Sequence, residues 1–227
     1  MWAIIKKEFK SYFLSPIGYV VVGILLIVCS IFFYLTSIQS GSVDLSSLYY
    51  YAALYGMIIV APILTMRMFA EERKSGTEQL ILTAPISITK VVLGKLIAAL
   101  GVIIITLLIS FMFFAIVCFF GKANIVPVLT SMLGFILVSI AAISVGMLAS
   151  SITENQVIAA IITIAFLIMS IFIENINSIF ANLSIMNFYE KFPSGLISFT
   201  EIAGLVSFSI VFIGLTILVM QRRKSVK

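Results

Sequence analysis

Six long apolar segments dominate the pattern of hydrophobic and polar positions, and short polar stretches separate them. A helix needs about 20 predominantly apolar residues to cross a hydrocarbon core of about 30 Å. The segments lie at about 17–38, 51–68, 91–120, 125–150, 157–173 and 202–220. The third is long enough to tilt or to extend beyond the bilayer. The pattern therefore predicts an all-α integral membrane protein, with residues 1–227 forming one transmembrane domain of six spans.

The composition supports the same interpretation. Of the 227 residues, 62% are hydrophobic and 10% are charged, and the mean hydropathy is +1.26. Soluble domains are typically about 45–50% apolar and about 25% charged. Six spans leave roughly 100 residues for ends and loops, so no large soluble domain fits.

The positive charges predict the orientation of the six spans. One side of the membrane would hold Lys6, Lys7, Lys10, Arg67, Arg73, Lys74, Lys90, Lys95, Arg222, Arg223, Lys224 and Lys227. The other side would hold Lys122 and Lys191. The positive-inside rule then places both termini in the cytoplasm. Because cytoplasmic loops account for the net charge of +5, no nucleic acid partner is needed to explain it.

The first 16 residues predict an amphipathic helix in the cytoplasmic interface of the membrane. Apolar side chains recur at roughly helical spacing at Trp2, Ile5, Phe9 and Phe13, while Lys6, Lys7 and Lys10 fall on the other side. Pro16 ends the helix and lets the chain turn into the membrane. The alternative is a basic segment that only fixes the topology.

The largest cytoplasmic connection, Arg67–Lys90, combines charged and apolar residues. Seven charged residues lie in it: Arg67, Glu71, Glu72, Arg73, Lys74, Glu78 and Lys90. Residues 77–82 predict a short amphipathic helix, with Leu80 and Ile81 facing differently from Glu78 and Gln79. Gly76 precedes this helix and Pro85 closes it. The apolar content favours docking onto another protein or the membrane. Packing of the helix on its own bundle, with an ordinary solvated charge cluster, is the alternative.

The last outer connection, residues 174–201, is long and partly apolar but too short to span the membrane twice. It predicts a re-entrant hairpin or a helix at the outer interface, with Pro193 and Gly195 forming the turn back. In the fourth span, Ala142, Gly146 and Ser150 form a stripe of small residues that indicates a packed helix face.

Charged residues are placed only near the ends of the spans. Lys95, Glu174 and Glu201 are within snorkelling reach of the interface, so we expect no proton relay and no buried ion site. This argues against an ion-coupled transporter. Pro62, within the second span, predicts a kink.

The residues of common catalytic sites are missing from the sequence. It contains no phosphate-binding loop of the Gly-x-x-x-x-Gly-Lys-Ser/Thr type and no histidine. Cys29 and Cys118 lie within apolar segments and are interpreted as small hydrophobic residues. We therefore expect no catalysis by this chain alone, and no cofactor or metal site on it.

A set of motifs follows the second span: FAEER at 69–73, SGTE at 75–78, LTAPIS at 82–87, then Lys90 and Gly94-Lys95. In combination they resemble the permeases of type 2 ABC exporters. Those permeases carry E-(K/R)-x-x-G-T-x-E, then Thr-x-Pro-(Ile/Val), and Gly-Lys at the start of the third span. The segment NFYEKFPSG, from Asn187 to Gly195, looks like the subgroup of gliding-motility and copper-enzyme-maturation permeases.

The resemblance implies a permease subunit of an ATP-driven exporter. The lack of a recognisable signal peptide and of long loops leads us to expect a bacterial inner membrane. The 67–90 connection would contain a coupling helix seated in a separate ATP-binding subunit, which would hold the ATP and Mg. A second permease, identical or homologous, would complete the complex. The residues implied in coupling are Glu71, Glu72, Arg73, Gly76, Thr77, Glu78 and Pro85.

The resemblance also implies a translocation path lined by the second and fifth spans. Met57, Met66, Phe166 and Met169 are the candidate lining residues, and their apolar side chains favour a hydrophobic or amphipathic substrate. Two alternatives remain open. One is an ABC-like complex that transmits force or signals without moving a solute, and the other is an ATP-independent channel or scaffold.

Overall fold

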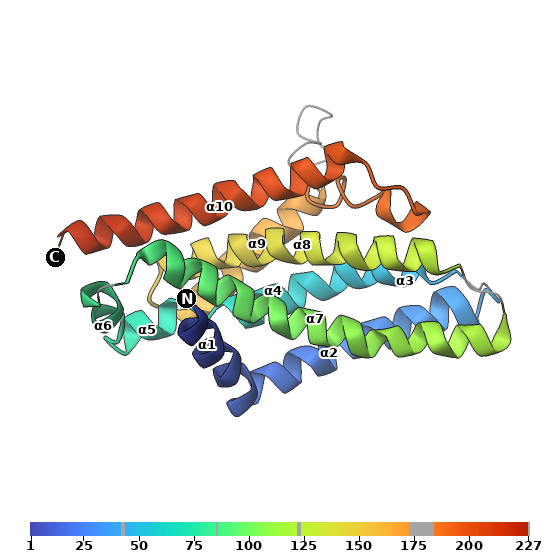
Figure 1. The fold of residues 1–227 in the computed structure, drawn as a ribbon, viewed down its shortest axis with the longest axis horizontal. Coiled ribbons are helices and arrows are strands. Elements are labelled where there is room, and N and C mark those ends of the chain that lie inside the picture. Colours follow the sequence, from blue (N-terminus) through green and yellow to red (C-terminus); the bar gives the residue numbers. More distant parts are fainter. Residues whose placement is uncertain (42–43, 85, 122–123, 173–183, 227) are drawn as a thin grey trace.

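A computed structural model describes residues 1–41, 44–84, 86–121, 124–172 and 184–226, and these residues form a bundle of long helices (Figure 1). The helices are α1 (Trp2–Leu14), α2 (Ile17–Phe33), α3 (Ser46–Tyr51), α4 (Met57–Thr65), α5 (Ala70–Lys74), α6 (Glu78–Thr83), α7 (Ile88–Phe120), α8 (Ile125–Ile152), α9 (Gln156–Phe172) and α10 (Phe199–Val226). The π-helical turns Tyr34–Ile38 and Ala52–Gly56 continue α2 and join α3 to α4.

Within the described residues, five helical stretches are long and apolar enough to cross a membrane. They are Ile17–Ile38, Ser46–Lys74, Ile88–Phe120, Ile125–Ile152 and Phe199–Lys224. The chain is thus a multi-pass membrane protein, and five of the expected apolar segments are confirmed as helices long enough to span a membrane. The remaining apolar helix, α9, has 17 described residues, and residues 173–183 lie outside the description. The sixth span therefore stays a prediction.

Helix α8 forms the centre of the bundle, because its small residues let neighbouring backbones approach closely. A Cβ atom on Gly146 would lie 2.1 Å from Oγ1 of Thr65 on α4. Ser150 Oγ accepts hydrogen bonds of 3.1 Å from the backbone N–H groups of Phe69 and Ala70. The stripe of small residues is buried, so the predicted packed face is confirmed.

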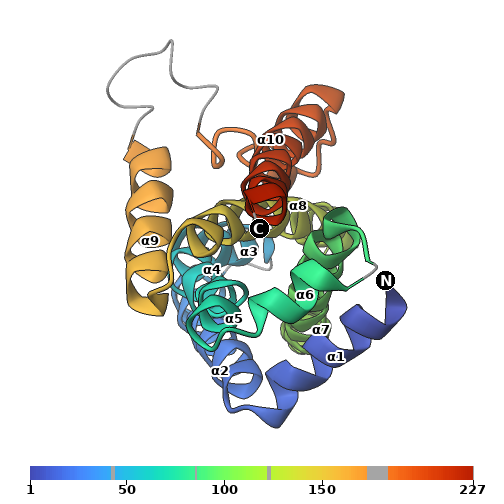
Figure 2. The same cartoon turned by 90° about the vertical axis from the view of Figure 1, so that its left-hand side faces the viewer.

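Helix α1 crosses the bundle near the end that carries α5 and α6, and both chain termini lie toward that end (Figures 1 and 2). It packs against α7 where glycines leave room: a Cβ on Gly94 would lie 3.0 Å from Ile4 Cγ2, and one on Gly101 would lie 2.9 Å from Phe9 Cε2. The helix ends at the extended residue Ser15, before Pro16, as predicted. Trp2 is exposed.

At the opposite end, the segment before α10 packs onto the first turns of α8. Tyr189 Oη donates to the carbonyl oxygen of Ser131 at 2.9 Å, and Thr130 Oγ1 donates to that of Phe192 at 2.9 Å. The predicted turn is confirmed, because the short helix Phe192–Ser194 ends at Gly195 with φ +80°. Of the connection for which a re-entrant or interfacial segment was predicted, residues 174–183 lie outside the described residues, and residues 185–191 form turns.

Candidate functional site

The connection between α4 and α7 folds into two short helices, α5 and α6, joined by a tight turn. In α5 the acidic residues Glu71 and Glu72 occupy the first turn and the basic residues Arg73 and Lys74 the last, an order that suits the helix dipole. Gly76 has φ +74°, a conformation that favours glycine. Thr77 Oγ1 donates to the carbonyl oxygen of Glu72 at 3.3 Å and holds the turn closed.

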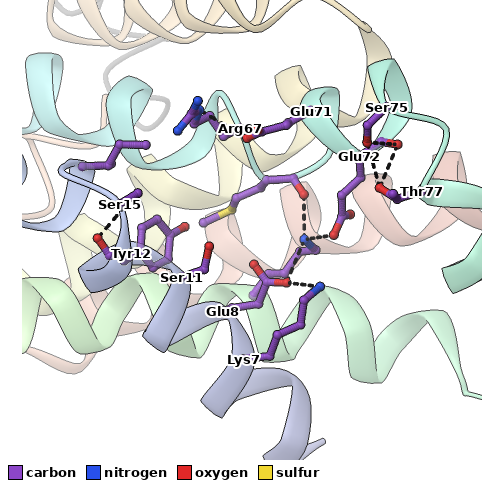
Figure 3. A pocket seen from close by; sticks show the side chains of 13 residues that line it. Lys7, Glu8, Ser11, Tyr12, Ser15, Arg67, Glu71, Glu72, Ser75 and Thr77 are labelled. Carbon is purple, nitrogen blue, oxygen red and sulfur yellow. Dashed lines mark hydrogen bonds and ion pairs between the residues drawn. The ribbon is translucent and has the colours of Figure 1, made fainter.

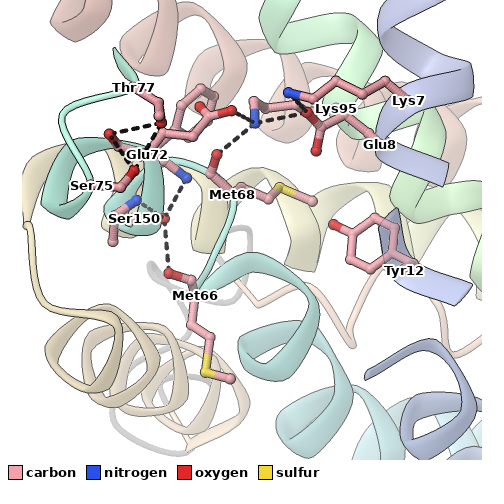
Figure 4. Close-up of polar contacts among 12 residues, drawn as sticks. Lys7, Glu8, Tyr12, Met66, Met68, Glu72, Ser75, Thr77, Lys95 and Ser150 are labelled. Carbon is pink, nitrogen blue, oxygen red and sulfur yellow. Dashed lines mark hydrogen bonds and ion pairs between the residues drawn. The ribbon is translucent and has the colours of Figure 1, made fainter. Parts of the chain in front are cut away.

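Lys95, two turns into α7, is the centre of a buried polar cluster that joins three parts of the chain (Figure 4). Its Nζ lies 2.7 Å from Glu72 Oε1 on α5, 2.7 Å from the carbonyl oxygen of Met68, and 3.3 Å from Glu8 Oε1 on α1. The ammonium has three N–H donors and meets three acceptors. The cluster therefore fastens α1 and α5 to α7.

The position of Lys95 corrects one expectation from the sequence. Its side chain is 2% exposed, so it does not snorkel to the interface. The physical reason is the pair of carboxylates, which compensate a charge that would be costly to bury alone. Beside the cluster, Tyr12 Oη donates to the carbonyl oxygen of Leu64 at 3.1 Å. Burial raises the pKa of Tyr12, and the charges of Glu8 and Glu72 raise it further, so this phenol stays a donor.

Two arginines fasten α5 and α6 to the opposite side of the bundle. Arg73 Nε lies 2.9 Å from Glu154 Oε1, and Arg73 Nη1 donates to the carbonyl oxygen of Ile152 at 3.0 Å. Arg223 Nη1 on α10 lies 3.2 Å from Glu78 Oε1, and its Nη2 reaches the same Ile152 oxygen at 3.5 Å. The two guanidinium groups thus meet at the C-terminal end of α8, where positive charge is favourable.

The exposed face of this unit is the turn and the outer side of α6. Ser75, Gly76, Thr77, Gln79 and Leu80 are exposed. Glu78 and Leu80 face differently, as expected for α6, since Glu78 is 8% exposed and Leu80 is 72% exposed. The expected grouping of Gln79 with Glu78 was wrong, because Gln79 is exposed together with Leu80. The ion pair with Arg223 turns Glu78 toward the bundle and leaves Leu80 outward. A cavity of about 160 Å³ between α1 and α6 is bordered by Leu80, Ile86 and Ile4.

A family model described as ABC-2 family transporter protein matches residues 2–223. The chain belongs to the ABC-2 transporter family. It is therefore a permease component of an ABC transporter, a membrane component that is not itself catalytic. A comparison with individual curated proteins finds no significant match.

In this ABC-2 permease, the residues implied in coupling do not share one outward face. Glu72, Arg73 and Glu78 bind partners on their own bundle, and only Gly76 and Thr77 are exposed without such an ion pair. Glu71 lies 3.2 Å from Arg67 in a half-exposed pair. Pro85 lies outside the described residues. Their part in coupling stays a prediction.

The four residues expected along a translocation path lie in different surroundings. Met57 is buried, with Sδ 3.6 Å from Ser139 Oγ on α8. Phe166 on α9 packs against Phe208 and Phe212 of α10. Met169 is 63% exposed, and Met66 is half-buried. No cavity described within this single chain unites the four.

Sequence reasoning missed the partners that hold α5 and α6, namely Glu8, Glu154 and Arg223. A signal existed for the first of these, because a lysine two turns inside an apolar helix requires a carboxylate nearby. Glu154 and Arg223 gave no such signal, since each lies next to polar residues at the end of an apolar segment.

Proposed function

We propose that this chain is one of two permease subunits of an ATP-driven exporter, and that the Arg67–Lys90 connection receives the motion of a separate ATP-binding subunit. That subunit would bind the ATP and Mg and perform the hydrolysis. The chain would have six spans with both termini in the cytoplasm of a bacterium. The two termini and the α5–α6 unit lie toward the same end of the bundle, which supports this topology (Figure 1).

The observation that carries the proposal is the way α5 and α6 are fastened. Glu72 connects them to α7, Arg73 to the α8–α9 connection, and Glu78 to α10. A displacement of the turn at Gly76 is therefore passed to three long helices together. A solvated loop without a mechanical role does not need three partly buried ion pairs.

The exposed residues around α6 supply a docking surface for the ATPase. Leu80 is an exposed apolar side chain on a helix otherwise held by polar contacts, and it borders the small cavity between α1 and α6. An apolar anchor among polar neighbours is the arrangement that concentrates binding energy in protein interfaces. The ion pairs fix the orientation of Leu80, and their charged groups would not contact the ATPase themselves.

For the substrate we propose a hydrophobic or amphipathic molecule. Met57, Met66, Phe166 and Met169 do not line a path within one chain, so a path through a permease pair would use the outward side of α9. Met169, Ile161 and Phe172 are exposed there. Outward transport and kinship with the gliding-motility and copper-enzyme-maturation subgroup are parts of the proposal that rest on the resemblance.

Affinity purification from mild-detergent membranes, with mass spectrometry of the bound proteins, is the first test. We expect an ATPase with a phosphate-binding loop in about 1:1 ratio with the permease, and loss of it in a Leu80→Glu variant. A Gln39→Glu variant, changed at an exposed residue in the connection after the first span, serves as control for a new charge. Recovery of the chain alone in detergent and nanodiscs would contradict the proposal and favour an ATP-independent channel or scaffold.

Transport by the purified complex separates the proposal from its other alternative. Reconstituted vesicles should show ATP-dependent movement of an amphipathic dye or peptide. Hydrolysis of ATP that responds to α6 variants but moves no solute would support a complex for force transmission or signalling.

A further inference from the structure

A polar cavity of about 400 Å³ lies between α1, the α4–α5 turn and the start of α7 (Figure 3). Its volume falls in the range of small-molecule sites. The lining differs from such sites in being largely polar, with Ser11 and Tyr12 of α1 beside several charged groups. Neither the coupling mechanism nor the packing of the bundle requires this space.

The charges on the wall are balanced in number and of both signs. Lys7, Arg67 and Lys95 face it together with Glu8, Glu71 and Glu72. Glu8 Oε1 contacts the ammonium groups of both Lys95 and Lys7, whereas Glu72 pairs with Lys95 through Oε1 and its Oε2 is buried with no hydrogen-bond partner among the described residues. At this end the wall is therefore short of hydrogen-bond donors.

The cationic groups on the wall retain donors. In the described contacts Arg67 uses its Nε, toward Glu71 at 3.2 Å and Gln156 at 3.4 Å. Lys7 is 69% exposed and makes a single contact, of 3.4 Å, with Glu8. A guanidinium and an ammonium with spare N–H groups are the usual partners of a phosphate. The cavity thus offers donors for a phosphate and carboxylates for an ammonium.

We propose that this cavity binds the headgroup of a phosphoethanolamine lipid. The lipid ammonium carries three N–H donors and would meet the carboxylate of Glu8, while Lys7 and Arg67 would hold the phosphate. A choline headgroup has no N–H donors, and a glycerol headgroup has no cation, so neither matches both ends. Because α1 carries the exposed Trp2, the cavity lies at headgroup depth in the proposed topology.

The inference depends on the proposed position of α1 in the membrane interface, but it does not depend on ATP coupling.

Its test is native mass spectrometry of the purified chain titrated with lipids of identical acyl chains and three headgroups: ethanolamine, choline and glycerol. We expect the ethanolamine lipid to bind about tenfold more tightly than the choline lipid, the effect of one charge-assisted hydrogen bond. Soluble phosphoethanolamine, as a separate arm, should compete if the headgroup alone is recognised.

Matched variants on α1 locate the site. Glu8→Gln should abolish the preference for ethanolamine, and Lys7→Gln should weaken the binding of all three lipids, because each carries the phosphate. Lys6→Gln removes the same charge from a residue that does not line the cavity and should leave the binding unchanged. Ser11→Trp, which fills the cavity from an exposed position, should weaken the binding of all three lipids as well. Equal binding of all three lipids, or equal effects of Lys6→Gln and Lys7→Gln, would overturn the proposal. Either outcome leaves the recovery of an ATPase with the permease unaffected.

Discussion

Arg223 on α10 and Glu78 at the first turn of α6 form an ion pair with 3.2 Å between Nη1 and Oε1, across 145 positions of the sequence. Both side chains are largely buried, at 21% and 10% exposure. The pair therefore connects α6 to a helix that is distant from it in the chain.

Exchange of the two charges tests whether this pair transmits motion. We expect Arg223→Glu and Glu78→Arg alone to reduce transport per ATP hydrolysed about tenfold, within the range of coupling energies of about 1–3 kcal/mol. The double variant should recover most of the coupling, because the pair is restored with reversed sign. Transport and hydrolysis are measured together in vesicles. A double variant as impaired as the singles would show that the individual residues, and not their pairing, are needed.

Replacement of Lys95 by methionine tests the buried cluster. The change leaves the carboxylate of Glu72 without its cation and Glu8 paired only with Lys7, at an expected cost of about 3–5 kcal/mol. The midpoint of thermal unfolding in detergent should fall accordingly. Lys90→Met, at an exposed position near the start of the same helix, should change stability by less than about 0.5 kcal/mol. Adding Glu8→Gln and Glu72→Gln to Lys95→Met should recover part of the loss.

The turn between α5 and α6 is tested at Gly76. Proline fixes φ near −65°, whereas Gly76 has φ +74°, so Gly76→Pro forces the turn to rearrange. We expect membrane insertion to persist and ATP hydrolysis to become uncoupled from transport. Gly76→Asn is the control, because asparagine tolerates the left-handed region better than other residues. Normal transport by Gly76→Pro in vesicles would show that the shape of this turn is irrelevant to coupling.

Glu72→Ala, which removes the carboxylate from Lys95, should also uncouple ATP hydrolysis from transport.

The contact between α8 and α4 is tested at Gly146. A methyl group there would overlap Thr65, so Gly146→Ala should destabilise the chain by about 1–3 kcal/mol. Gly214→Ala, on α10, meets no atom within 4 Å and serves as a matched control. Thermal unfolding of the two variants should differ clearly. Equal midpoints would mean that the helices separate at this point at little cost.

The spans were predictable because long apolar runs have few alternatives in a membrane. The stripe of small residues on α8 and the end of α1 before Pro16 were also predictable, since each depends on local residue type. The sequence pattern did not predict the π-helical turns at Tyr34–Ile38 and Ala52–Gly56. Those features depend on packing between helices rather than on local hydropathy.

The candidate site was predictable as a segment but not as a set of contacts. Helix α6 has six residues, fewer than two turns, so its polar and apolar positions do not define one face. Arg223 decides the orientation of Glu78, and the sequence gives no measure of which of several basic residues will be near. The burial of Lys95 likewise depends on Glu8 and Glu72, which come from two other helices.

The bond between Arg223 and Glu78 also has a consequence for biosynthesis. A ribosome makes α6 well before α10, so α6 lacks its ion pair with Arg223 until α10 has been made. Only when α10 has entered the membrane can Arg223 reach Glu78 and Ile152. An ATPase that recognises the anchored arrangement would bind finished permeases and ignore incomplete ones. The separation of these two residues along the chain would then determine that the ATPase binds only after α10 has been inserted.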